Sequence, residues 1–158
     1  MKNKKIILFL TFLVIGFMVS GCGKKDVYMD VPAEDGRYYY QNEDLGFAAT
    51  LPAEFIYYQT QRVANEDYID IEFYLPTSDE SYKQKVPGYA NLLVVRAYEQ
   101  ETWDKVNNDE ATAIYKKFGE TGDRVLAAKI VDSVPSDWEG RWTEELQKNI
   151  RENLSIIK

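Results

Sequence analysis

The sequence predicts an α+β fold, in which helices pack across an antiparallel sheet. Two observations favour this class. Segments with the alternation of strands follow one another along the chain, and the strongest helical pattern comes late, after Pro135. A chain of 158 residues is also long enough for one domain with its own core.

The amino-terminal segment has the composition of an export signal. Residues 1–5 hold three lysines, and the 14 residues of segment 6–19 carry no charge. That apolar run is shorter than the roughly 18 to 20 residues of a membrane-spanning helix, but it fits the apolar part of a signal peptide. The segment therefore predicts export from the cytoplasm.

The motif that ends this signal is Val19-Ser20-Gly21-Cys22, and Cys22 is the only cysteine of the chain. An aliphatic residue, two small residues and a cysteine resemble the lipobox of bacterial lipoproteins. That resemblance implies a signal peptide at 1–21 that is recognised and cut before Cys22, whose thiol carries diacylglycerol and whose new amino group is acylated, for example with palmitate. It places the protein on the extracytoplasmic face of a bacterial cell membrane. A free thiol behind an ordinary signal, or an uncleaved anchor, are the alternatives.

The rest of the chain divides into a tether and a domain. Residues 22–36 are polar and lack an amphipathic period, so we expect a lipidated cysteine and a flexible tether. Residues 37–158 then form a single extracytoplasmic globular domain. Six segments are predicted to be strands, namely 37–41, 46–51, 55–63, 68–75, 91–98 and 124–131. The first two flank a turn at 42–45, and segment 91–98 is apolar on both faces, which predicts a central strand.

Two segments are predicted to be helices. One covers 109–118, capped by Asn108 and stopped by Gly119. The other begins with the capping box formed by Ser136 and Glu139. Its apolar stripe consists of residues spaced four apart, namely Trp138, Trp142, Leu146, Ile150 and Leu154.

The stretches "YYYQNEDLGFAATLPAEF" and "FGETGDRVLAAKIVDSVPSDW" resemble PsbP-type domains. The shared features are a short strand, a Gly-Phe strand start, a Leu-Pro end, and Asp132-x-x-Pro135-x-Asp137 before the last helix. The resemblance implies an α-β-α sandwich with a central antiparallel sheet and a long C-terminal amphipathic helix over 37–150. No functional residue is carried over from that family.

Composition excludes several kinds of chemistry. The chain has no histidine, which rules out Ser-His and Cys-His catalysis and histidine-ligated zinc. Its net charge is −7, and because the first 21 residues hold three lysines and no acid, the mature chain has a net charge of −10. Such a chain repels phosphates, so nucleic acid is not an expected partner.

Two groups of side chains are candidates for a site. Five acids surround one predicted strand, namely Asp67, Asp70, Glu72, Asp79 and Glu80. They could hold calcium, but without a calcium-loop motif we interpret them as a solvated face. The tyrosine clusters at 38–40 and 57–58 could form a binding platform, but we interpret them as sheet packing. Asp132 and Asp137 are expected to shape the turn around Pro135.

These observations predict a non-enzymatic binding or accessory subunit of an envelope protein complex, held to the membrane by its amino-terminal lipid. We expect a protein partner, no cofactor, no metal and no catalytic residues. The alternative is a carboxylate-dependent hydrolase acting on envelope glycans, because the chain has 26 acidic residues from which a catalytic pair could be drawn. A passive structural role at the cell surface is also open.

Overall fold

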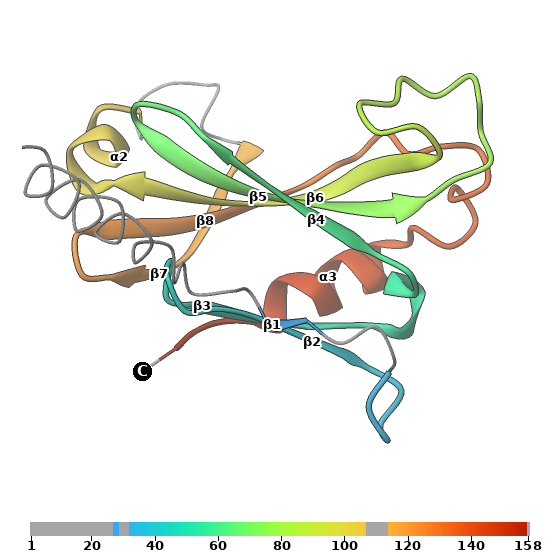
Figure 1. Cartoon of the computed structure of the whole chain (residues 1–158), viewed down its shortest axis with the longest axis horizontal. Coiled ribbons are helices and arrows are strands. Elements are labelled where there is room, and N and C mark those ends of the chain that lie inside the picture. The colour runs from blue at the N-terminus through green and yellow to red at the C-terminus, as the bar shows by residue number, and fades with distance from the viewer. Residues whose placement is uncertain (1–26, 29–31, 107–113, 158) are drawn as a thin grey trace, which may run out of the picture.

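The computed structural model describes residues 27–28, 32–106 and 114–157, which form two antiparallel sheets (Figure 1). In Figure 1 the sheets lie one above the other, and helix α3 (Glu144–Glu152) lies between them. Buried side chains from both sheets and from α3 belong to one hydrophobic cluster. The core therefore fills the space between the sheets.

The smaller sheet has four strands in the order β1-β2-β3-β9. They are β1 (Val27–Tyr28), β2 (Tyr38–Asn42), β3 (Phe47–Leu51) and β9 (Leu154–Ile156). The predicted hairpin is confirmed, since β2 and β3 pair with Tyr38 opposite Leu51 and Asn42 opposite Phe47. Alternate residues of these two strands are buried, as the period of two predicts.

The turn between β2 and β3 is held by Asn42, which is fully buried. Its Oδ1 accepts a hydrogen bond from the Leu45 backbone N–H at 2.9 Å, and its backbone oxygen accepts one from Gly46, also at 2.9 Å. Gly46 has φ +73, a conformation that glycine adopts without strain. A Cβ at this position would lie 2.6 Å from Thr121 Oγ1, so the turn packs closely against the larger sheet.

The larger sheet has five strands in the order β4-β5-β6-β8-β7. They are β4 (Gln59–Ala64), β5 (Tyr68–Pro76), β6 (Tyr89–Glu99), β8 (Arg124–Ile130) and β7 (Lys116–Thr121). The central position predicted for segment 91–98 is confirmed, because it lies in β6. Ile71, Phe73 and Leu75 of β5 share the inner face and are fully buried, as their alternation predicts.

The predicted α-β-α sandwich with a long C-terminal helix is wrong. The described residues form two facing sheets with two short α-helices, and α3 has nine residues. The capping box at Ser136 does not open this helix, because Ser136 donates its backbone N–H to Asp79 at 2.9 Å and Asp137 bonds to Thr77 at 2.7 Å. These tertiary hydrogen bonds keep the start of the predicted helix in turns instead of a helix.

Thr143 caps α3 instead, since its hydroxyl accepts a hydrogen bond from the Leu146 backbone N–H at 3.2 Å. The stripe residues nevertheless face the core. Trp138 is 2 % exposed and Trp142 is 6 % exposed, and Leu154 extends the stripe as the first residue of β9 rather than as helix. The indole N–H groups donate to Pro76 and Val131 backbone oxygens, respectively.

Two further predictions are corrected. Helix 109–118 falls partly on residues 107–113, outside the described residues, but its end belongs to β7, where Phe118 packs near Phe47 with ring centroids 6.3 Å apart. The strand predicted over 55–63 begins only at Gln59, because a 3-10 turn, η2 (Ala53–Phe55), precedes it. Helix α2 (Gln100–Val106) was not predicted.

Candidate functional site

An exposed apolar loop lies between η2 and β4. Four large hydrophobic residues of the described chain are exposed, namely Tyr39, Ile56, Tyr57 and Ile114. Two of them are adjacent, with Ile56 45 % exposed and Tyr57 70 % exposed. We call these two residues the 56–57 loop. Tyr57 has φ 60, which is uncommon for a bulky side chain.

The loop stands out because its neighbours are anchored in the core. Phe55 is fully buried and Tyr58 is 7 % exposed, with ring centroids 6.4 Å apart. The Tyr58 backbone N–H donates to the Phe55 backbone oxygen at 3.1 Å and closes a tight turn. With both flanking rings directed inward, Ile56 and Tyr57 are left in solvent.

An open groove of about 480 Å³ lies between η2, which precedes this loop in the chain, and the start of α3. Its lining residues are Pro52, Glu54, Gly140, Arg141, Thr143, Glu145, Leu146 and Asn149. We call it the η2–α3 groove. The lining combines two apolar side chains, two carboxylates, a guanidinium, a hydroxyl and an amide, which suits a polar surface of a partner better than an apolar ligand.

Arg141 is the cation of this groove. Its guanidinium lies 4.1 Å from the ring centroid of Trp138, and its Nη2 donates to the Asp137 backbone oxygen at 3.2 Å. A guanidinium held over an indole is partly preorganised and keeps other donors available for a ligand. The buried Trp138 thus positions a charge at the rim of the groove.

A second constellation lies on the outer face of the larger sheet, under α2. Arg96 binds Asp70 through two hydrogen bonds, of 2.7 and 2.8 Å. The same guanidinium lies 3.5 Å from the ring centroid of Tyr68 and 4.4 Å from that of Tyr115. Burial alone would lower the pKa of Arg96, but its hydrogen bonds to Asp70 and Tyr98 raise it.

This Arg96 cluster stabilises the sheet and does not form an open site. Asp70 is 6 % exposed and is neutralised by the paired guanidinium. Burial raises the pKa of Tyr115 to about 12. Helix α2 adds Trp103, whose ring centroid lies 5.3 Å from that of Tyr98. The charged and aromatic groups of the Arg96 cluster therefore contact one another and leave no open site between them.

Of the five candidate acids, Asp70, Glu72 and Asp79 bind different partners. Glu72 accepts hydrogen bonds from Tyr74 at 2.6 Å and from Lys85 at 2.7 Å. Asp79 accepts from Ser81 and Ser136 backbone N–H groups. Among the residues that the structure describes, no three histidine, cysteine, aspartate or glutamate side chains are close enough together to hold a metal ion.

Asp79 and Asp137 join two loops at one end of the molecule. Asp137 accepts hydrogen bonds from the Thr77 hydroxyl at 2.7 Å and from the Ser78 backbone N–H at 3.0 Å. Burial raises the pKa of Asp137, but the bonds from Ser78 and Thr77 outweigh it, so the pKa is lowered. The backbone N–H of Ser136 and the hydroxyl of Ser81 lower the pKa of Asp79. Asp137 therefore shapes the turn, as predicted.

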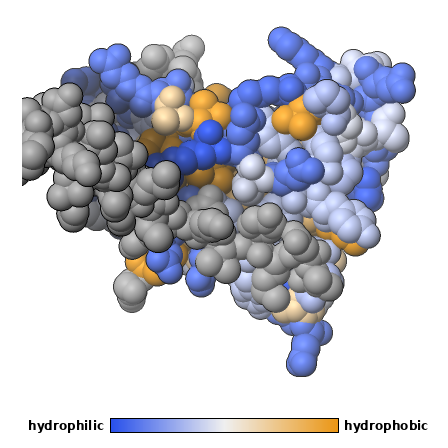
Figure 2. Space-filling view, viewed as in Figure 1, coloured by the Kyte–Doolittle hydropathy of each residue, from blue (hydrophilic) through white to orange (hydrophobic). Residues whose placement is uncertain are grey.

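The tyrosine clusters mostly build the core. Tyr38, Tyr40 and Tyr58 are buried, which confirms sheet packing for these three residues. Tyr39 is 40 % exposed and donates its hydroxyl to Asp35 at 2.6 Å. Of the clustered tyrosines, Tyr57 therefore remains the candidate for a binding role. Figure 2 shows a mainly hydrophilic face with scattered small apolar patches.

The lipobox residues Val19, Ser20, Gly21 and Cys22 lie outside the described residues. Among the helices that are described, none is long and apolar enough to cross a membrane. Comparison with known protein families, with curated proteins and with solved structures finds no match for this chain.

Sequence reasoning missed the η2–α3 groove because its walls come from distant segments, 52–54 and 140–149. No local motif links them. A signal for the 56–57 loop was present, since Phe55 and Tyr58 are three residues apart and disturb the alternation of a strand. Such spacing indicates a turn with two apolar side chains left outside.

Proposed function

We propose that this protein is a membrane-anchored extracytoplasmic lipoprotein that acts as a non-enzymatic binding or accessory subunit of an envelope protein complex. The lipobox at Val19–Cys22 supports the anchor on the extracytoplasmic face of a bacterial cell membrane. The exposed 56–57 loop, which follows the η2 wall of a charged groove in the chain, is the observation that carries the binding function.

The partner is a protein. Exposing two large apolar residues, one of them in a strained backbone conformation, is unfavourable for an isolated domain and is compensated when a partner covers them. Tyrosine and arginine are enriched at the energetic centres of protein interfaces, and both are present here as Tyr57 and Arg141. The mature chain's acidity makes nucleic acid an unsuitable partner.

Site-specific crosslinking tests this function. A photoreactive residue in place of Tyr57, in the lipidated full-length protein in cells, should crosslink to a discrete envelope protein. The same residue in place of Lys148, which is 71 % exposed on α3, serves as the matched control and should not. The crosslink should be lost when Ile56→Asp or Arg141→Glu is added. Equal crosslinking from both positions, or none from position 57, would contradict a docking site here.

The alternative hydrolase has one observation in its favour, because Glu54 and Glu145 line the same groove. A glycosidase needs one carboxyl with a raised pKa as a general acid. Among the described residues, the aspartates with shifted pKa values are Asp35, Asp79 and Asp137, and all three pKa values are lowered. Turnover of isolated envelope glycans by the purified protein, abolished by Glu54→Gln with Glu145→Gln, would favour the enzyme over the binding subunit.

A further inference from the structure

Strand β4 is an open edge of the larger sheet. It stands at the end of the strand order, and in Figure 1 it crosses in front of β5 and β6. Its six residues pair with β5 without a bulge, from Gln59 opposite Tyr74 to Ala64 opposite Ile69. Among the described residues, no strand pairs with the other side of β4, so that side presents backbone groups in the way an incomplete sheet does.

The turn between β4 and β5 shows which of these backbone groups point outward. The Asn65 N–H donates to the Tyr68 backbone oxygen at 2.9 Å, so the backbone of Asn65 is directed toward β5. Because this direction alternates along an antiparallel strand, every second residue of β4 points away from the sheet, namely Thr60, Arg62 and Ala64. Their N–H and C=O groups have the spacing that an added strand requires.

The other sheet edges are shorter or covered. Strand β7, at the opposite edge of the larger sheet, has a register shift between Lys117 and Gly119, and β9 packs against Gly119. The smaller sheet ends in β1 and β9, of two and three residues. Short strands, bulges and covering elements protect sheet edges from pairing. Segment 59–64 is instead long and regular and contains no proline, glycine or lysine, and its charged residue, Arg62, is paired with Asp44 at 2.7 Å.

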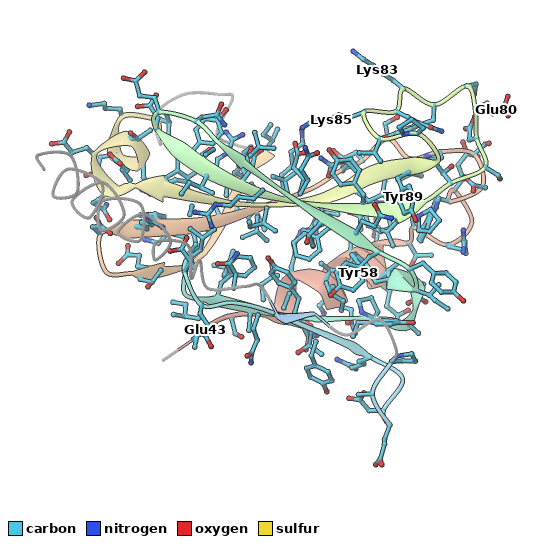
Figure 3. The ribbon with its side chains drawn as sticks, in the orientation of Figure 1. Glu43, Tyr58, Glu80, Lys83, Lys85 and Tyr89 are labelled. Carbon is cyan, nitrogen blue, oxygen red and sulfur yellow. The ribbon has the colours of Figure 1, made fainter. Side chains whose placement is uncertain are left out.

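We propose that the partner recognised at the 56–57 loop adds an extended strand to β4 and so enlarges the larger sheet. The inference rests on the docking site of the proposed function, because the loop is joined to β4 by Tyr58 alone, whose buried ring lies between the sheets (Figure 3). The added strand hydrogen-bonds to the outward backbone groups of β4. It presents polar, uncharged side chains to the exposed amides of Gln59 and Gln61.

A second copy of this chain is a poor occupant of this edge. If two β4 strands paired antiparallel through all of their outward residues, Arg62 would lie opposite Arg62 of the second copy, and like charges directly opposite each other are destabilising. Each mature chain also has a net charge of −10, which opposes the close approach of two copies. The occupant is therefore an extended segment of a different envelope protein.

Proline substitutions test the strand pairing through the crosslink from position 57. In the lipidated full-length protein in cells, Thr60→Pro and Ala64→Pro each remove one outward N–H and leave the bonds between β4 and β5 in place. Each should lower the crosslinked fraction about fivefold or more, because a carbonyl of the added strand is left unpaired. Thr60→Ala and Ala64→Ser keep the N–H and should crosslink as the natural sequence does. Equal crosslinking of the proline variants and their controls would overturn the added strand.

A second crosslinking position gives a test that does not depend on the folding of the proline variants. A photoreactive residue in place of Gln61 should crosslink to the same protein as position 57, whereas one in place of Lys117, exposed on β7, should not. No crosslink from position 61 would overturn the added strand alone, and a product made of two copies of this chain would overturn the different partner. No crosslink from position 57 in the natural sequence would instead overturn the docking site and the proposed function.

Discussion

On the outer face of the larger sheet, Asp70 and Arg96 form a charge pair. Breaking this pair is expected to lower the free energy of unfolding. The side chains of Asp70 and Arg96 are 8 % and 17 % exposed. Removing one partner of such a pair leaves an uncompensated charge and typically costs about 3 to 5 kcal/mol, whereas removing both costs less. Arg96→Met should therefore lower the free energy of unfolding strongly, and Asp70→Leu with Arg96→Met should restore part of it.

Urea unfolding of the two single variants and the double variant measures this coupling. The exposed pair of Lys148 and Glu152, 71 % and 63 % exposed, is the comparison, and its loss should change the free energy of unfolding by less than about 1 kcal/mol. Strictly additive effects at Asp70 and Arg96 would contradict the coupled pair.

The carboxylates of Asp79 and Asp137 should make the stability of the folded chain sensitive to acid. Their pKa values in the folded chain lie below the ordinary value of 3.8. The two ionised carboxylates therefore contribute their full stabilisation of the folded chain above about pH 4. This stabilisation is lost as the pH falls, because the unfolded chain takes up protons first. Urea midpoints at pH 7, 5 and 3 should fall less steeply for Asp79→Asn with Asp137→Asn than for the natural sequence. Parallel pH profiles would show that these carboxylates do not contribute.

At the scale of elements, strands were easier to predict than helices. The alternation of Phe47, Ala49 and Leu51 reflects one buried face, which is a local property of the strand. The start of the long predicted helix instead depends on Asp79 and Thr77, which lie about 60 residues from Ser136 and Asp137. A local pattern contains no information about such partners. The groove was unpredictable for the same reason.

The packing of the segment that connects β8 to α3 can be tested by substitution. Trp142 is 6 % exposed, its ring centroid lies 6.5 Å from that of Phe55, and its indole donates to Val131 at 2.8 Å. Truncation of a buried tryptophan typically costs about 3 to 5 kcal/mol. Trp142→Ala should therefore lower the thermal midpoint strongly, whereas Lys148→Ala on the exposed side of α3 should hardly change it. Calorimetry measures both, and two equally harmless substitutions would contradict docking of this segment.

At the scale of the whole molecule, two sheets enclose one core, and α3 lies between them (Figure 1). Strand β1 pairs with β2 at the edge of the smaller sheet, and the 56–57 loop lies between η2 and β4. The lipobox could be predicted from sequence because it is a contiguous motif, whereas the pairing of β1 with β2 depends on a partner about 14 residues further along the chain.

The anchor and the domain should be separable by mutation. Cys22→Ala removes the thiol that would carry diacylglycerol, so acylation should be abolished and the protein should leave the lipidated membrane fraction. The fold should persist, because the core lies between the two sheets and, among the described residues, the buried cluster begins at Tyr38. A lipid-free chain of residues 24–158 should be soluble and unfold in one cooperative transition. Lipid labelling and sedimentation test the first expectation, and circular dichroism during urea unfolding tests the second. Unchanged labelling of Cys22→Ala would overturn the lipoprotein assignment, and a gradual transition of the lipid-free chain would overturn the independent domain.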